Sequence, residues 1–161
     1  MLSTQGGESN HSGQFLEDAI EMEFRRRGVK VFSYAEKGDD LDLFEPGWLI
    51  RQYPYVSMYG CRARSEFLYR RRVHGDIRIE CRQQTVSGSV DEKFPYFFQN
   101  ALTVPEHEVW LVVDGGGAKP SALRWLKAAC AREESKIIRF LSIYEARAHI
   151  KNLLASPIRA V

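Results

Sequence analysis

The sequence predicts an α/β domain with a central mixed β-sheet flanked by helices. Segments whose apolar residues recur with a helical period alternate with segments that have strand character, an order typical of layered α/β folds. Residues 64–84 form a predicted hairpin, and the continuous apolar run at residues 107–115 is typical of a buried strand. At 161 residues and 44% hydrophobic, without an internal repeat or linker, the chain is expected to form one domain with a single core.

The N-terminal part of the chain begins with a predicted tail and continues with a helix. Residues 1–12 are polar and rich in Gly, Ser and Asn, which predicts a flexible tail in front of a single domain at residues 13–161. From Gly13 to Arg27 the apolar residues fall on one broad helical face, and Gly28 ends the helix. The tail is therefore expected to lie outside the core.

The remaining elements follow from periodicity and from turn residues. The segment "VKVFSY" (29–34) is predicted to be a strand, whereas prolines and glycines in residues 35–60 predict a long connection with little regular structure, of a kind that is often functional. After the hairpin we expect a helix entered from Ser89, a strand within residues 107–115, a helix from Pro120 to about Arg132, and a strand within residues 136–143. A last helix is expected at about 143–154, and Ser142 and Glu145 form a capping box at its start.

Membrane association and disulfide or zinc frameworks are not expected. No apolar run approaches the roughly 20 residues needed to cross a bilayer, and the first residues lack the order of a signal peptide. Cys61, Cys81 and Cys130 are odd in number and far apart, which indicates reduced, mostly buried thiols. Together these features favour a cytoplasmic protein.

Basic charge is concentrated in the middle of the chain. Between Arg51 and Arg82 lie eight arginines against three acids, with tyrosines among them. Such a run is often a solvated face, but it also fits a surface for a polyanion, because the guanidinium fork matches phosphates and base edges. Both interpretations remain open on composition alone.

The hairpin register predicts which carboxylates meet. If the turn is centred on Val73, Glu66 lies opposite Glu80, with Cβ atoms about 4.5–5.5 Å apart, close enough to share a hard cation. Asp76 lies about 13 Å from Glu80 along an unbroken strand, so it is only a fallback ligand if a bulge shortens the hairpin. The repulsion between Glu66 and Glu80 requires neutralisation, either by neighbouring arginines or by a divalent metal ion.

Strand alternation places Glu80, Arg82 and Gln84 on one face. A carboxylate, a cation and an amide in a row are useful for hydrolysing a phosphodiester. Arg82 cannot serve as a general base near neutral pH, but it can clamp a phosphate. Lys93, in the following helix, is the candidate for a replacement lysine, although it also fits a solvated helix residue.

The segments "SEFLYRRR" and "IRIECRQQTVSGSVDEKFPYFFQNAL" resemble the core of the PD-(D/E)XK nuclease superfamily. The resemblance extends over residues 13–131 and is most specific in residues 64–100. It implies a restriction-endonuclease-like core of order αβββαβ, here with an added C-terminal strand and helix. It also implies roles for matching positions: the helix acid Glu17, the sheet acids Glu66 and Glu80, Arg82 in place of the usual lysine, the trailing glutamine Gln84, and a migrated lysine, Lys93.

By this resemblance the protein is expected to be a metal-dependent DNA nuclease, with endonuclease action and a role in phage or bacterial DNA processing or restriction. Mg²⁺, or Mn²⁺, would be held by Glu66, Glu80 and the carbonyl of Cys81, with Glu17 assisting through water. The expected partners are double-stranded or branched DNA, and a homodimer if both strands are cut. The residues expected to contact DNA are Arg62, Arg64, Arg70, Arg71, Arg72, His74 and Lys119.

Two further classes of function remain open at this point. The replacement of lysine by Arg82 is compatible with a binding module that retains affinity for DNA, or for a Holliday-type junction, without turnover. A regulatory or interaction protein built on the same scaffold would leave the acids without a metal ion.

Overall fold

A computed structural model describes residues 8–37, 41–83 and 91–155. Its described part contains one six-stranded sheet whose strand order in space, β1-β2-β3-β4-β5-β6, is the order along the chain. The strands are β1 (Val31–Ser33), β2 (Leu49–Val56), β3 (Arg62–Tyr69), β4 (Ile77–Gln83), β5 (Glu108–Asp114) and β6 (Ile137–Leu141). The main helices are α1 (Glu8–Arg25), α2 (Tyr34–Lys37), α3 (Phe94–Thr103), α4 (Pro120–Arg132) and α5 (Ile143–Ala155).

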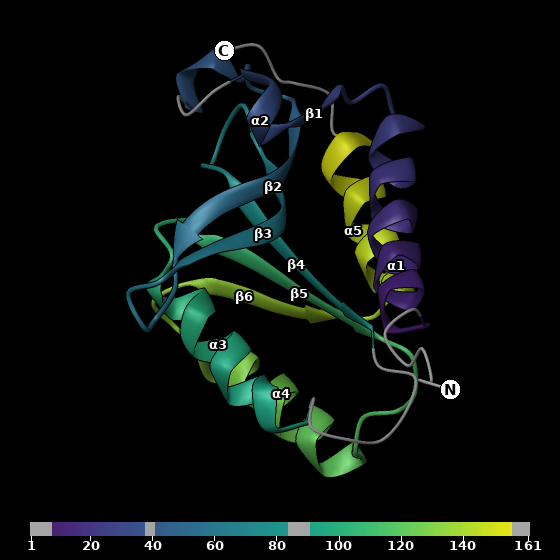
Figure 1. Cartoon of the computed structure of the whole chain (residues 1–161), viewed down its shortest axis with the longest axis vertical. Coiled ribbons are helices and arrows are strands. Elements are labelled where there is room, and N and C mark those ends of the chain that lie inside the picture. The colour runs from purple at the N-terminus through teal and green to yellow at the C-terminus, as the bar shows by residue number, and fades with distance from the viewer. Residues whose placement is uncertain (1–7, 38–40, 84–90, 156–161) are drawn as a thin grey trace, which may run out of the picture.

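The sheet is mixed, as the sequence predicts. β2, β3 and β4 are antiparallel neighbours, whereas β1 runs parallel to β2, and β5 runs parallel to both β4 and β6. Figure 1 shows α1 beside α5 on one face of the sheet and α3 beside α4 on the other. The predicted α/β architecture is therefore confirmed.

Each face of the sheet has its own hydrophobic core. Under α1 and α5, alternate residues of the central strands pack against the helices, among them Phe67, Ile79 and Trp110. Under α3 and α4, the other alternate residues do the same, including Val109 and Leu111. This period-2 division explains why β5 is apolar on both sides, as its continuous hydrophobic run predicts.

The prediction of a long irregular connection at residues 35–60 is wrong, because this segment contains β2, a full member of the sheet. Pro54 lies within that strand and faces Arg64 of β3. The short β1 pairs with β2 only as far as Arg51, so Pro54 lies where β2 is the edge of the sheet. There the missing N–H of a proline costs no hydrogen bond to a neighbouring strand.

Two helix starts differ from the sequence prediction. α1 begins at Glu8 rather than Gly13, so the expected tail overlaps the first turns of this helix. α3 begins at Phe94, after a 3₁₀ turn at Asp91–Lys93, and the predicted start at Ser89 lies outside the described residues. None of the helices in the described ranges is long and apolar enough to cross a membrane.

The predicted capping box at the start of α5 is confirmed. The Ser142 backbone N–H donates to Glu145 Oε2 at 2.8 Å, and the Glu145 N–H donates to Ser142 Oγ at 3.2 Å. α5 is further tied to α1 by Arg147, whose Nε lies 3.2 Å from Glu23 Oε2. The first and last helices are thus joined by both apolar packing and an ion pair.

Candidate active site

The hairpin of β3 and β4 has the predicted register, since Phe67 faces Ile79, Leu68 faces Arg78 and Tyr69 faces Ile77. The pairing of β3 with β4 ends there. β3 continues beside β2 while β4 continues beside β5 as far as Gln83, so the two strands separate. We call the opening between them the fork.

The backbone of β2 is unusual directly beside the fork. Gln52 has a φ of 55°, in the left-handed region that non-glycine residues rarely adopt, and the β2–β3 pairing is interrupted between Arg51 and Tyr53. By register, Gln52 lies opposite Glu66. Strain of this kind often occurs beside functional residues.

The Glu66 carboxylate lies in the fork, where it accepts hydrogen bonds from two groups of β4. Its Oε2 accepts a hydrogen bond from the backbone N–H of Cys81 at 2.9 Å, and its Oε1 accepts one from Arg82 Nη1 at 2.8 Å. The same Nη1 donates to the carbonyl of Cys81 at 2.7 Å, and Arg82 Nη2 lies 3.8 Å from Glu80 Oε2. The guanidinium therefore lies among the three oxygen donors that the sequence predicts as a cation site.

Glu80 is strongly affected by this environment. Burial raises the pKa of Glu80 well above its usual range, and the negative charge of Glu66 and a hydrogen bond between the two carboxyl groups raise it further, while Arg82 lowers it. The expected proximity of Glu66 and Glu80 is thus present in the structure.

The helix acid Glu17 also lies near the fork. Its pKa is raised by burial and then by the negative charge of Glu66, against the opposing effect of Arg82. α1 therefore brings a third carboxylate to the two from the sheet. When all three are ionised, the acids exceed the Arg82 guanidinium in charge, and a further cation would favour their ionised forms.

The oxygen donors fit a hard divalent cation in chemical type, since carboxylates and carbonyls are the ligands that Mg²⁺ and Mn²⁺ prefer. Within residues 8–37, 41–83 and 91–155, no group of three or more His, Cys, Asp or Glu side chains is arranged to hold a metal ion. The candidate ligands are instead the carboxylates of Glu66 and Glu80 and the carbonyl of Cys81, and the Arg82 guanidinium contacts all three. A metal ion would have to share this space with the guanidinium or displace it.

Of the remaining predicted catalytic residues, Arg82 and Lys93 lie on the α3 side. The Arg82 guanidinium packs 4.7 Å over the Phe97 ring, and Arg82 and Lys93 line the same groove. Gln84 lies outside the described residues. The backbone N–H of Lys119 donates to Asp91 Oδ1 at 3.0 Å, which holds the loop after β5 beside the 3₁₀ turn that carries Lys93.

The predicted DNA-contacting residues divide between the two ends of the hairpin. Arg62 and Arg64 are exposed on β3, on the strand that also carries Glu66. Arg70, Arg71, Arg72 and His74 lie at the turn end, where Arg71 contacts Glu108 at 3.0 Å and also donates to the His74 carbonyl. Lys119 lies away from the hairpin, in the loop after β5. The Arg72 guanidinium lies against Gly47, so close that an added Cβ there would be 3.4 Å from Nε.

Asp76 is also at the turn end, where its Oδ2 lies 3.4 Å from Arg70 Nε. This contact matches the predicted register, which places Arg70 opposite Asp76. β4 is unbroken between Ile77 and Gln83, so Asp76 remains remote from Glu80. The intramolecular contacts of Arg70 and Arg71 favour a structural role for both, and their contact with DNA stays a prediction.

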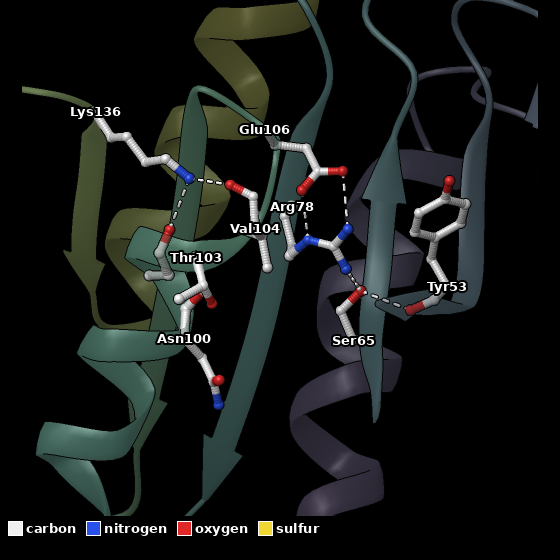
Figure 2. Close-up of polar contacts among 9 residues, drawn as sticks. Tyr53, Ser65, Arg78, Asn100, Thr103, Val104, Glu106 and Lys136 are labelled. Atoms are coloured by element: carbon white, nitrogen blue, oxygen red, sulfur yellow. Dashed lines mark hydrogen bonds and ion pairs between the residues drawn. The ribbon is translucent and has the colours of Figure 1, made fainter. Parts of the chain in front are cut away.

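Sequence reasoning missed the role of Arg78, which is only 1% exposed. Figure 2 shows its guanidinium in a two-pronged contact with Glu106, with Nε–Oε2 and Nη2–Oε1 distances of 2.7 and 2.8 Å, and bonded to Ser65 Oγ at 2.8 Å. The charged group also lies over the rings of Tyr53 and Tyr55, at 5.3 and 5.0 Å.

The contacts of Arg78 hold β3 and β4 together next to the fork. Ser65 directly precedes Glu66, and Arg78 precedes Glu80 by two residues on the same face of β4. The network therefore fixes both strands at the point where they begin to separate. An arginine two residues before an acid on a predicted hairpin strand was the available sequence signal, but it did not identify Glu106 as the partner.

Comparison with known proteins gives one match. A family model described as a PD-(D/E)XK nuclease superfamily domain matches residues 8–153, nearly the whole chain. No curated protein and no solved structure matches the chain. The matched range includes the fork, both cores and all five main helices almost to their ends.

Proposed function

The chain belongs to the PD-(D/E)XK nuclease superfamily, and we propose that it is a metal-dependent endonuclease that hydrolyses phosphodiester bonds in DNA. The observation that carries this proposal is the meeting of Glu17, Glu66 and Glu80 around Arg82 at the fork. The proposed setting is DNA processing or restriction in a phage or a bacterium.

Glu66, Glu80 and the Cys81 carbonyl are the proposed ligands of Mg²⁺ or Mn²⁺, and Glu17 would assist through water. Nucleases of this superfamily generally use divalent metal ions. When bound, the ion would lower the pKa of a water molecule and neutralise charge on the phosphate. Burial and the charge of Glu66 raise the pKa of Glu80 and so favour its protonated form. A cation bound beside Glu80 would lower this pKa and favour the ionised carboxylate that binds it.

Arg82 is the proposed phosphate clamp. Its side chain is 35% exposed, so it can reach a ligand while its Nη1 is held by Glu66. A fixed guanidinium aimed at the phosphate stabilises negative charge as it develops in the transition state. Lys93, exposed in the same groove, is the proposed second cation, which orients the attacking water or the leaving strand.

The proposed partner is double-stranded or branched DNA. Arg62 and Arg64 are exposed on β3 beside Glu66 and supply the first phosphate contacts, and Lys119 adds one from the loop after β5. Cleavage of both strands by one small active site would need two copies of the chain, so a homodimer on DNA is part of this proposal.

A second candidate is a DNA-binding protein of the same fold that does not cleave. The observation that favours it is the position of Arg82 Nη1, 2.8 Å from Glu66 Oε1 and 2.7 Å from the Cys81 carbonyl. A permanent cation at this position can satisfy the acids without a metal ion. The two candidates differ in turnover, not in affinity for DNA.

Cleavage of supercoiled plasmid distinguishes the two candidates. The wild-type protein is expected to nick or linearise the plasmid with Mg²⁺ or Mn²⁺ and to be inactive with a chelator. Glu80→Ala should lower the rate by at least about 100-fold, because several kcal/mol of transition-state stabilisation depend on the metal site. Glu134→Ala, at an exposed acid after α4, is the matched control and should cleave like the wild type.

Binding measured in parallel decides the interpretation of a negative result. If the protein binds DNA with an affinity that falls steeply with salt but shows no metal-dependent cleavage, it is the DNA-binding protein of the second candidate and not a nuclease. Absent or salt-insensitive binding contradicts both candidates.

A further inference from the structure

A groove of about 630 Å³ begins at Arg82 and extends over the start of α3. Its lining combines the rings of Tyr59, Tyr96 and Phe97 with the cations Arg82 and Lys93 and one acid, Glu92. The volume lies within the roughly 300–1,000 Å³ typical of ligand sites. Aromatic rings beside an excess of positive charge are suited to a ligand that is both planar and anionic.

Two tyrosines form a stacked pair in this groove. The rings of Tyr59 and Tyr96 are 5.3 Å apart between centroids and inclined by 19°. Tyr59 is 71% exposed, so the ring face that does not contact Tyr96 is open to solvent. The stacked pair lines the groove together with Arg82 and Lys93, so the open ring face of Tyr59 lies beside two cations.

The position of Tyr59 is fixed by the body of the protein. It lies in the turn between β2 and β3, and the adjacent Met58 donates its backbone N–H to Asn100 Oδ1 at 2.8 Å. Asn100 is buried, and it lies one helical turn after Tyr96 on α3. Inside the turn, the Gly60 N–H donates to the Ser57 carbonyl at 2.9 Å. The exposed ring is therefore held in place before any ligand binds.

We propose that Tyr59 and Tyr96 form a stacking site for an unpaired nucleotide of the substrate, next to the phosphate that Arg82 clamps. A base inside a duplex has both faces covered by its neighbours, so a protein ring can stack only on a base that is unpaired or turned out of the helix. Arg82 and Lys93 line the same groove and would contact the phosphates on either side of that base.

This inference rests on the proposed function and narrows its substrate class. The preferred DNA has a single-stranded tail, a branch or an extruded base close to the scissile bond. Uninterrupted duplex would use the phosphate contacts of β3 but leave the tyrosine pair empty.

The test measures binding in the presence of a chelator, so that cleavage does not enter. The probes are a blunt duplex and the same duplex with a short single-stranded tail that contains 2-aminopurine, whose fluorescence is quenched by stacking. The wild type should bind the tailed probe more tightly and quench its fluorescence. Tyr59→Ala should weaken binding of the tailed probe about tenfold and abolish the quenching, without a change for the blunt probe.

Two further variants separate stacking from other effects. Tyr59→Phe keeps the ring and should keep both the affinity and the quenching. Tyr144→Ala removes a tyrosine that is 78% exposed on α5, on the other face of the sheet, and should bind both probes like the wild type. Equal affinity of the wild type for the two probes, or an equal effect of Tyr59→Ala on both, would overturn the inference.

The outcome does not depend on the plasmid assay. Metal-dependent cleavage without any preference for the tailed probe leaves the proposed nuclease intact and removes the stacking site. A preference that depends on Tyr59, without cleavage, leaves the stacking site intact and removes the nuclease.

Discussion

At the turn end of the β3–β4 hairpin each acid has an arginine beside it, whereas at the fork end three glutamates lie around one arginine. Asp76 contacts Arg70, and Glu108 contacts both Arg71 and Arg139. At the fork, Glu66 and Glu80 contact the same Arg82. The acids around one end of the hairpin thus each have an arginine partner, whereas those around the other end share one.

Glu108 and Glu80 show this difference in their pKa values, whereas at Asp76 burial outweighs the charge of Arg70 and raises the pKa. Burial raises the pKa of Glu108, but hydrogen bonds from Trp110 and Arg139 and the charge of Arg71 outweigh burial and lower it overall. At the fork, burial and Glu66 raise the pKa of Glu80. The ionised Glu108 therefore stabilises the fold, whereas ionisation of Glu80 at the fork has a cost that a bound cation would offset.

The largest expected effect concerns Arg78, which lies between the two ends. Arg78→Met should lower the free energy of unfolding by about 3 kcal/mol or more, because Glu106 would remain as a partly buried charge without its partner. Chemical denaturation measures this change. Arg78→Met with Glu106→Leu should recover most of the loss, and a single variant as stable as the wild type would contradict the role given to this pair.

Replacing Arg82 at the fork, and Arg70 at the turn end as a control, tests whether Mn²⁺ binds at the fork. In Arg82→Gln the guanidinium no longer competes for the oxygens of Glu66 and Cys81. Addition of Mn²⁺ should therefore stabilise this variant by about 1.4 kcal/mol more than the wild type, which corresponds to tenfold tighter binding. Thermal unfolding with and without Mn²⁺ gives the difference.

Arg70→Gln is the matched control at the turn end. Its stability should fall slightly, because Asp76 loses a partner, but Mn²⁺ should stabilise it no more than the wild type. If both variants gain equally from Mn²⁺, the ion does not bind at the fork.

The smallest expected effect concerns the pH dependence of the turn end. The pKa of Glu108 is lower in the folded state than in the unfolded chain, so the unfolded chain takes up the proton first as pH falls. The carboxylate therefore contributes its full stabilisation only above the pKa of the unfolded chain, near 4.5. Glu108→Gln should cost about 1 kcal/mol at neutral pH, since the amide keeps an acceptor for Trp110. Below the unfolded value the difference from the wild type should shrink as pH falls through the folded pKa.

Thermal unfolding of both proteins across this pH range provides the measurement. A difference that grows as the pH is lowered would show the opposite sign of linkage and contradict the assignment of Glu108 as a stabilising carboxylate.

The sequence was most informative where structure is local. The hairpin register follows from a period of two and a short turn, and its paired part from Phe67 to Tyr69 is as predicted. Glu66 and Glu80 lie just beyond it, where both contact Arg82. β2 could not be predicted, because Pro54 has the same sequence signature in a loop and at a sheet edge.

Contacts between distant parts of the chain were also beyond sequence reasoning. The bonds of Arg82 to Glu66 and to the Cys81 carbonyl exist because the strands separate, which no residue pattern specified. The bond from Met58 to Asn100 joins residues 42 positions apart. Neither residue type indicated the other as its partner.

The strand order also bears on how the protein is made. Because each strand pairs with its neighbour in the chain, the sheet can be assembled progressively while the polypeptide is synthesised, through a hairpin turn or a parallel crossover at each step. α1 is different, since it packs against α5 at the far end of the chain as well as against β4. The position of Glu17 is thus expected to be fully fixed only when α5 is in place, so that a half-made chain would carry the sheet acids without the complete proposed site.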